Sequence, residues 1–216
     1  MGTVTISASY GARGDTIAKA VAEELGLPFL DRAIPLAVAR QLHLSEDSAE
    51  AHDERVPSRW DRFFSAFSGS DEGVTAVGLS AAPFESPETF RLATEEVIRQ
   101  VAGTSGAVIL GRAGMVVLDG WDDVLRVRLD GPVEARITQA ISDGADEVSA
   151  RDAQKDVDGA RQYYAHFFYK VRQDDIRLYQ LVIDSTALPV ATCVDLVVRA
   201  AEARFHAGAD ASRALR

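Results

Sequence analysis

Short apolar runs alternate along most of the chain with longer segments that carry helical periodicity. The runs are apolar or rich in β-branched residues, as buried strands are, and lie at 3–8, 27–30, 107–110, 124–129 and 181–183. After the first run, Ile17, Val21 and Leu25 fall at four-residue spacing, and Gly26 ends that helix. Strands that alternate with amphipathic helices form parallel sheets covered on both faces, so the pattern predicts a three-layer α/β fold with a five-stranded parallel sheet. Further helices are expected at 34–42, from 45 onward, and at 87–102, 132–141, 147–170 and 189–205.

Two segments depart from this alternation. Residues 56–85 hold an aromatic cluster at helical spacing followed by a Gly/Ser-rich stretch, and we interpret them as an insertion with a mobile tip. The aromatic residues of the cluster are Trp60, Phe63, Phe64 and Phe67. They either pack internally or form the surface of a homodimer. Residues 206–216 are small and polar without periodicity, which predicts a frayed tail.

Composition narrows the class of ligand. The 216 residues include 47% hydrophobic and 26% charged residues, as in an ordinary globular protein, and the formal net charge is −10. This acidity argues against general nucleic-acid binding, which needs a basic surface. Only three of the 23 basic residues are lysines, so phosphate recognition would rest on arginine forks. One cysteine, Cys193, excludes an intrachain disulfide, and together with the lack of a membrane-spanning stretch or a secretion signal this predicts a cytoplasmic protein.

The segment from Ser9 to Thr16 joins the first strand to the first helix. Its glycines, Gly11 and Gly14, would let backbone N–H groups face a phosphate at the positive end of the helix. Arg13 could supply a cation and Thr16 a hydroxyl for Mg²⁺. The strict phosphate-loop signature with its lysine is absent, so a purely structural tight turn is the alternative.

Two more motifs follow strands. Asp31 and Arg32 come after the second strand, and Arg112 follows the third strand between Gly111 and Gly114. Ligands in open α/β sheets gather at the carboxyl ends of strands, where these side chains would lie. The alternatives are a helix cap at Asp31 and a surface arginine at position 112.

The segment 147–170 carries several charged residues on one helical face. Arg151, Lys155 and Asp158 fall at four- and three-residue spacing, and Arg161 follows. Such cations could close over a transferring phosphoryl group, whereas a solvated ladder of salt bridges is the alternative. The four histidines have no metal-binding spacing, and no serine occupies a Gly-x-Ser-x-Gly elbow.

Taken in order, these motifs resemble the cytidylate kinase-like family. The resemblance is carried by TISASYGARGDTIAKAVAEELGLPFLDRAI, VILGRAG, RLDGPVEARI, KDVDGARQYY and LVIDST, and it covers the chain from Val4 to about Ala200 except 56–85. It implies an adenylate-kinase-like P-loop domain over residues 1–205, with a monophosphate-binding insertion at 31–100 and a lid at 145–172.

The resemblance also implies residue roles. The phosphate loop would comprise Gly11, Ala12, Arg13, Gly14, Asp15 and Thr16, with Thr16 on Mg²⁺. The acceptor would meet Asp31, Arg32, Arg112 and Asp158, and the catalytic arginines would be Arg13, Arg151 and Arg161. Asp184, Ser185 and Thr186 would close the last strand near the base-binding wall.

The family therefore predicts phosphoryl transfer from ATP to a nucleoside monophosphate, CMP or dCMP first, with small nucleotides as partners. Cytidylate kinases carry lysine where this chain has Gly14 and an acidic residue where it has Leu110, although lysine-free loops also occur in the cytidylate kinase-like branch. The alternative hypothesis is a catalytically silent module that binds a nucleotide or phosphate and acts in regulation or dimerisation.

Overall fold

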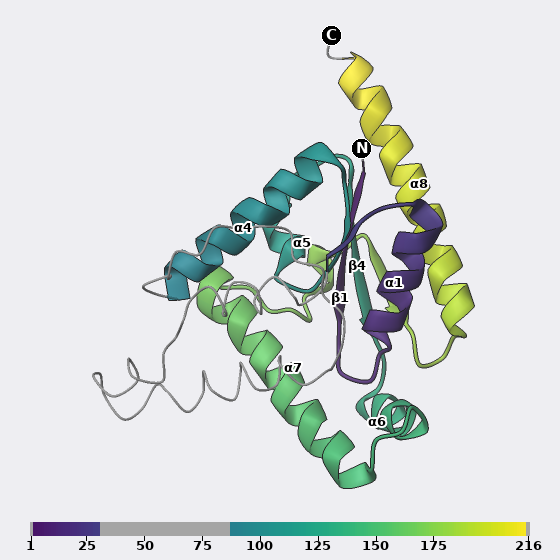
Figure 1. Ribbon diagram of the computed structural model, residues 1–216. Coiled ribbons are helices and arrows are strands. Elements are labelled where there is room, and N and C mark those ends of the chain that lie inside the picture. Colours follow the sequence, from purple (N-terminus) through teal and green to yellow (C-terminus); the bar gives the residue numbers. More distant parts are fainter. Residues whose placement is uncertain (1, 31–86, 215–216) are drawn as a thin grey trace.

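The computed structural model describes residues 2–30 and 87–214 (Figure 1). Five parallel strands form one sheet in the order β2-β3-β1-β4-β5, so the expected five-stranded parallel sheet is confirmed. The strands are β1 Thr3–Ala8, β2 Phe29–Leu30, β3 Val108–Leu110, β4 Val124–Asp130 and β5 Leu181–Asp184.

Helices connect the strands as crossovers. They are α1 Gly14–Leu25, α4 Pro87–Thr104, α5 Gly114–Val117, α6 Val133–Ser142, α7 Glu147–Tyr169 and α8 Val190–Ala214, with a 3₁₀ turn η2 at Ile176–Leu178. Gly26 ends α1 in the left-handed conformation that its sequence position predicts. The short elements α5 and η2 were not expected, because one turn of helix carries too few residues to show periodicity.

The C-terminal segment differs from its prediction. Helix α8 continues to Ala214, so most of the stretch expected to be a frayed tail from His206 onward is helical. In Figure 1 this part of α8 extends beyond the sheet, where no apolar face is needed, which is why the residues lack periodicity. The helices expected at 34–42 and after 45, and the aromatic cluster between 60 and 67, lie outside the described residues.

The sheet has two covered faces. Helices α1 and α8 pack side by side on one face, while α4, α5 and α7 lie on the other (Figure 1). The larger core cluster joins β1, β4, α1 and α8 through side chains such as Ile6, Ile17, Val127 and Val197, all 0–1% exposed. Burial of this apolar area is the main stabilising term of the fold.

The two faces of β1 differ in polarity. Val4, Ile6 and Ala8 belong to the apolar cluster under α1 and α8. Thr5 and Ser7 alternate with them and face the other layer, where Thr5 lies against Gly114 and the Ser7 hydroxyl lies 3.6 Å from the Met115 sulfur. The face of β1 toward α5 and α7 is therefore buried but polar.

Candidate active site

The turns after β1 and β3 lie side by side at one edge of the sheet. Ile6 pairs with Leu110, and both strands end there in parallel. A cavity of about 790 Å³ opens at this edge. It is bounded by the β1–α1 turn, the turn after β3, the end of α6 and the inner face of α7. Arg112 and the β1–α1 turn therefore lie at the same edge of the sheet, as expected.

Two glycines give the β1–α1 turn its shape. Gly11 has a φ of +74°, and a Cβ atom there would overlap the carbonyl oxygen of Arg136. A Cβ atom at Gly14 would overlap the Cβ of Ala8. Because Gly14 stands where cytidylate kinases carry their lysine, the methyl group of Ala8 excludes any side chain from that place in this turn.

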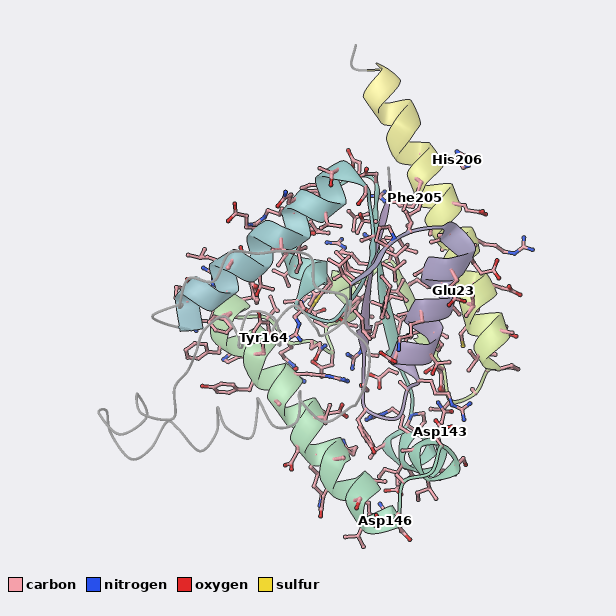
Figure 2. The ribbon with its side chains drawn as sticks, viewed as in Figure 1. Glu23, Asp143, Asp146, Tyr164, Phe205 and His206 are labelled. Atoms are coloured by element: carbon pink, nitrogen blue, oxygen red, sulfur yellow. The ribbon has the colours of Figure 1, made fainter. Side chains whose placement is uncertain are left out.

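Arg13 caps α1 in a conformation that is unusual for arginine. Its φ and ψ are 51° and 32°, in the left-handed region, which is strained for a residue with a Cβ atom. Its guanidinium donates to both carboxylate oxygens of Asp143, at 3.0 and 2.6 Å. The hydrogen bond to Asp143 raises the pKa of Arg13 against the opposing effect of burial. Asp143 follows α6, next to the N-terminal end of α1 (Figure 2).

The first turn of α1 presents backbone N–H groups. Between described residues, no hydrogen bond uses the N–H of Gly14, Asp15 or Thr16, as expected for the first turn of a helix. These residues line the cavity, and the positive end of the helix dipole lies there. The carboxylate of Asp15 is paired with Lys19 at 3.0 Å, so the charge of Lys19 offsets the negative charge of Asp15 at the mouth of the turn.

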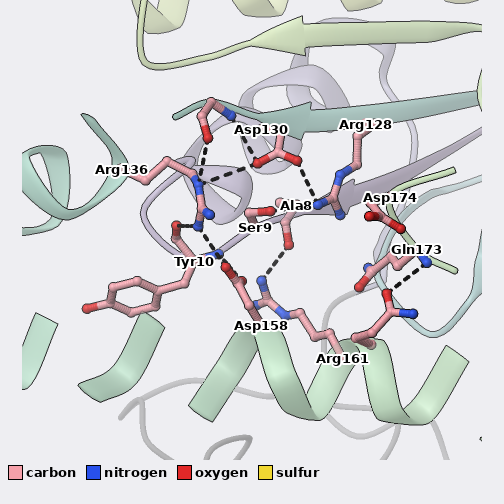
Figure 3. Close-up of polar contacts among 12 residues, drawn as sticks. Ala8, Ser9, Tyr10, Arg128, Asp130, Arg136, Asp158, Arg161, Gln173 and Asp174 are labelled. Atoms are coloured by element: carbon pink, nitrogen blue, oxygen red, sulfur yellow. Dashed lines mark hydrogen bonds and ion pairs between the residues drawn. The ribbon is translucent and has the colours of Figure 1, made fainter. Parts of the chain in front are cut away.

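Side chains from helices α6 and α7 hold the backbone of the turn (Figure 3). On α7, Asp158 accepts the Tyr10 N–H at 2.8 Å and Arg161 donates to the Ala8 carbonyl. On α6, Arg136 donates to the Tyr10 carbonyl at 2.7 Å and to Asp158 at 2.8 Å.

The other end of the turn is held in the same way. Gln139 on α6 donates to the Gly11 carbonyl at 3.0 Å. Ser185, directly after β5, donates to the Ala12 carbonyl at 2.8 Å. Side chains therefore donate hydrogen bonds to the carbonyls of the turn. The backbone N–H groups on its helix side belong to residues that line the cavity.

Arg112 is built into the cavity wall. The residue is 6% exposed and has a φ of +60°, and Ala113 after it has a φ of +51°. Two consecutive non-glycine residues in the left-handed region mark a strained turn of the kind found at functional sites. Tyr164 on α7 lines the same cavity; burial raises the pKa of its phenol, partly opposed by the charge of Arg112, so the phenol stays neutral.

The structure brings some predicted site residues together and leaves others apart. Seven of the predicted site residues line the larger cavity: Gly11, Arg13, Gly14, Asp15, Thr16, Arg112 and Arg161. Ala12 is fully buried behind the turn. Asp31 and Arg32 lie outside the described residues.

Arg151 and Asp158 do not reach this cavity. The side chain of Arg151 is 42% exposed and pairs with Glu134 and Glu147, as the salt-bridge alternative predicted. Asp158 binds the turn itself and lines a neighbouring, smaller cavity. Their assigned roles in catalysis and substrate binding stay predictions.

Several contacts of the site could not be predicted from the sequence. Arg136 lay within a motif that carried the family resemblance, but its contact with the turn spans 126 positions. Asp143 and Ser185 likewise act across long sequence separations. Spacing along one helix or strand cannot reveal such contacts.

The site offers few protein ligands for a metal ion. Among the described residues, no group of three or more His, Cys, Asp or Glu side chains could hold one. Thr16 fits the one-hydroxyl role that Mg²⁺ uses beside phosphate, since this ion keeps several waters and phosphate oxygens as ligands.

Comparison with known proteins decides the family. The model of the cytidylate kinase-like family matches residues 3–187. The chain belongs to the cytidylate kinase-like family. Membership confirms the expected resemblance and, with the strand order, the three-layer P-loop kinase fold. It also supports a nucleotide-dependent, kinase-like function.

Other similarities are more distant. A solved structure of an uncharacterized protein from Eubacterium ventriosum has a TM-score of 0.63 at 16% identity, covering 94% of this chain and 99% of that one. A shikimate kinase from Bacteroides thetaiotaomicron has a TM-score of 0.49 at 14% identity, covering 93% and 98%.

One curated relative spans more than this chain. A uronate isomerase of Corynebacterium glutamicum is 28% identical over 142 residues, which cover 65% of this chain. The match covers only 26% of the length of that protein.

Within residues 2–30 and 87–214, no helix has the length and apolarity needed to cross a membrane.

Proposed function

We propose that this chain transfers a phosphoryl group from ATP to a nucleoside monophosphate, with CMP or dCMP as the first candidate acceptor. The observation that carries the proposal is the β1–α1 turn. Its backbone is fixed by Gly11 and by side chains from α6 and α7, and its helix-side amides face a cavity of about 790 Å³. That volume is within the usual range of small-molecule sites.

The turn would bind the phosphates of the donor. The first-turn amides of α1 supply fixed N–H donors at the positive end of the helix. Arg13 supplies the charge that lysine gives in cytidylate kinases, and it does so by exchanging Asp143 for phosphate oxygens. Asp143 is thus a competitor for the bound anion and sets how strongly Arg13 contributes.

The acceptor phosphate would lie against Arg112. A buried guanidinium at a fixed position binds a phosphate with two parallel hydrogen bonds. Arg161, which lines the same cavity, would neutralise charge on the moving group. No side chain needs to act as a base, because a monophosphate oxygen is already anionic.

Thr16 would hold Mg²⁺ together with phosphate oxygens and water. The ion would neutralise the negative charge that builds up on the transferred group. ATP and Mg²⁺ are therefore the ligands that we expect, and small nucleotides the partners. A cytoplasmic location and a homodimer stay predictions.

A second function is favoured by one observation. The methyl group of Ala8 leaves no room for a lysine side chain at position 14, so the usual positioning cation of this fold is sterically excluded. A chain that binds nucleotides without turnover and acts as a regulatory module would need only the amides and Arg13.

A coupled assay with ATP, Mg²⁺ and each nucleoside monophosphate tests the first function. We expect turnover with at least one acceptor, and a loss of at least about tenfold in kcat/KM for Arg13→Ala, since a charged contact contributes roughly 1.5–3 kcal/mol. Arg177→Ala is the matched control, because Arg177 is an exposed arginine paired with Asp175 outside the cavity.

Calorimetry separates the outcomes. Binding of ATP without turnover for any monophosphate at high enzyme concentration would support the silent module. No binding of ATP, a monophosphate or inorganic phosphate would contradict both functions.

A further inference from the structure

A second cavity lies beside the first. It measures about 470 Å³ and is enclosed by the ends of β1 and β4, the middle of α7 and the segment that follows α7. Its lining residues are Ser9, Arg128, Asp130, Arg136, Asp158, Gln162, Arg172, Gln173 and Asp174. We call it the Arg128 cavity, after the residue on its sheet side. No role was predicted for Arg128 from the sequence, although it lies in the motif RLDGPVEARI.

Arg128 is an arginine inside the sheet. It lies on β4 between Ser7 of β1 and Val182 of β5 in the strand register, and the residue is 7% exposed. Its Nη2 donates to the Ser9 hydroxyl at 2.6 Å and to Asp130 at 2.9 Å. Its Nε and Nη1 are enclosed, and neither has a hydrogen-bond partner in the described part of the chain.

Enclosed donors without acceptors are unfavourable. An unsatisfied buried polar group is typically destabilising by about 1–3 kcal/mol, and more when it is charged. Native structures therefore rarely keep such groups unless water or a ligand reaches them. Figure 3 shows the Arg128 guanidinium between Ser9 and Asp130 on one side and Gln173 and Asp174 on the other.

The carboxylates of the Arg128 cavity already have cationic partners. Asp130 pairs with Arg128 and Arg136, and Asp158 pairs with Arg136 at 2.8 Å. Asp174 pairs with Arg172 at 2.6 Å.

The side-chain oxygen of Gln162 accepts the Gln173 N–H. Among the enclosed polar atoms of the cavity, the nitrogens Nε and Nη1 of Arg128 have no hydrogen-bond partner in the described part of the chain, and their complement is a pair of acceptor oxygens.

We propose that the Arg128 cavity binds the oxyanion group of a small ligand, a carboxylate or a phosphate, through Arg128. Planar arginine binds such groups with two parallel hydrogen bonds. Arg172, on the segment that follows α7, adds a second cation at the rim, where its side chain is 74% exposed. Ser9 and Gln173 line both cavities, but Arg128 does not line the larger one, so the proposal does not rest on the proposed kinase function.

Crystals soaked in sodium selenate test the site directly. We expect anomalous density within hydrogen-bond distance of Nε and Nη1 of Arg128, separate from any density at the β1–α1 turn. Absence of density at Arg128 at a concentration that fills the turn would overturn the proposal. Density at Arg128 alone would support it even if the kinase proposal fails.

Solution binding adds a matched pair of variants. Arg126 lies two residues earlier on β4 and faces the same layer, but it pairs with Asp119 and Gln180. Titration of the protein with inorganic phosphate and with malonate, followed by thermal shift, should raise the Tm of the wild type and of Arg126→Met. Arg128→Met should lose at least tenfold in apparent affinity for the oxyanion that binds. Equal responses of the two variants would show that an adventitious ion only is bound.

The two oxyanions identify the ligand class. Only the part of each response that Arg128→Met abolishes reports on this cavity, because the β1–α1 turn is itself proposed to bind phosphate. An Arg128-dependent response to malonate alone assigns a carboxylate ligand, and one to phosphate alone assigns a phosphorylated ligand. No Arg128-dependent response to either contradicts the proposal. Arg128→Lys keeps the charge without the planar fork and should weaken binding less than Arg128→Met does. It also tests the site if Arg128→Met does not fold.

Discussion

Gly14 and Ala8 occupy complementary space at the start of α1. The methyl group of Ala8 fills the place into which a side chain at position 14 would project. Position 14 therefore cannot present a cation, and we propose that Arg13, whose backbone is in the left-handed conformation, supplies it. At this site the two small residues decide which residue can carry charge.

Gly14→Lys should therefore destabilise the fold unless Ala8 is also replaced by glycine. We expect Gly14→Lys alone to lower the free energy of unfolding by about 1–3 kcal/mol through overpacking. The double variant Ala8→Gly/Gly14→Lys should recover part of that loss and bind ATP at least tenfold more tightly than the wild type. Urea denaturation and calorimetry measure both, with Ala8→Gly as the control; equal stability of the single and double variants would show that the two residues do not compete for space.

Asp143 should compete with a bound phosphate for Arg13. Asp143→Asn removes a carboxylate from the cavity and releases the guanidinium, so the affinity for ATP should rise several-fold, corresponding to roughly 1 kcal/mol. Asp122→Asn, at an exposed pair with Arg204 that lines neither cavity, is the control. Unchanged or weaker ATP binding in Asp143→Asn, measured by calorimetry, would argue against Arg13 as a phosphate ligand.

Asp130 should make stability depend on pH. Burial opposes ionisation of this carboxylate, but Arg128, Ser9 and the Gly131 N–H outweigh it and lower the pKa of Asp130. A carboxylate with a lowered pKa stabilises the fold above its unfolded pKa of about 3.9 and loses that effect as pH falls through the folded pKa.

Asp130→Asn should accordingly be less stable than the wild type at pH 7, by about 1 kcal/mol because the carboxylate is 34% exposed and partly screened. The difference in free energy of unfolding should shrink as pH falls below about 4. Urea denaturation between pH 3 and 7 measures it. A difference that stays constant with pH would contradict the assigned ion pair.

At the scale of elements, α7 supports the β1–α1 turn. Asp158 and Arg161 lie three residues apart on one face, and both bind the backbone of the turn. Any movement of this helix relative to the sheet must break the Asp158 contact with the Tyr10 N–H. The position of α7 and the shape of the turn are therefore coupled.

Asp158→Ala should loosen the turn. It removes the acceptor of the Tyr10 N–H and leaves Arg136, 5% exposed, without this partner, so we expect a loss of about 1–3 kcal/mol in stability. Hydrogen exchange at the Tyr10 amide should become at least tenfold faster. Asp152→Ala, an exposed position on the same helix, should change neither quantity. Unchanged exchange in Asp158→Ala would show that α7 does not hold the turn.

At the scale of the whole molecule, the two layers of helices pack on opposite faces of one sheet. Cys193 on α8 is fully buried against the cluster that also holds α1, β1 and β4. Burial and the nearby charge of Asp184 raise the pKa of its thiol, so both access and ionisation disfavour reaction. The thiol therefore reports on separation of α8 from the sheet.

Alkylation of Cys193 by iodoacetamide should be at least 100-fold slower in the native protein than in urea. Ile6→Ala, at a core position that is 1% exposed, should lower the free energy of unfolding by about 2–5 kcal/mol and speed alkylation. Val182→Ala, 47% exposed on the edge strand β5, should lower it by less than about 1 kcal/mol. Rapid alkylation of the native protein would contradict the packing of α8.

The sequence by itself determined the layers of this protein. Each strand is a short apolar run and each long helix repeats its apolar residues every three or four positions, so local patterns sufficed for the sheet, for the crossovers and for the end of α1 at Gly26. The turn between β1 and α1 could also be predicted, because its glycines, the strand before it and the helix after it are adjacent in sequence.

Only the tertiary structure decided what surrounds that turn. Arg136, Asp158 and Ser185 reach it across 126 to 173 positions, and the pairing of Arg13 with Asp143 spans 130. The exclusion of a lysine by Ala8 and the enclosed guanidinium of Arg128 likewise depend on packing between elements. Periodicity records which face of an element is buried, whereas the partner that a polar group meets is set by how the elements pack.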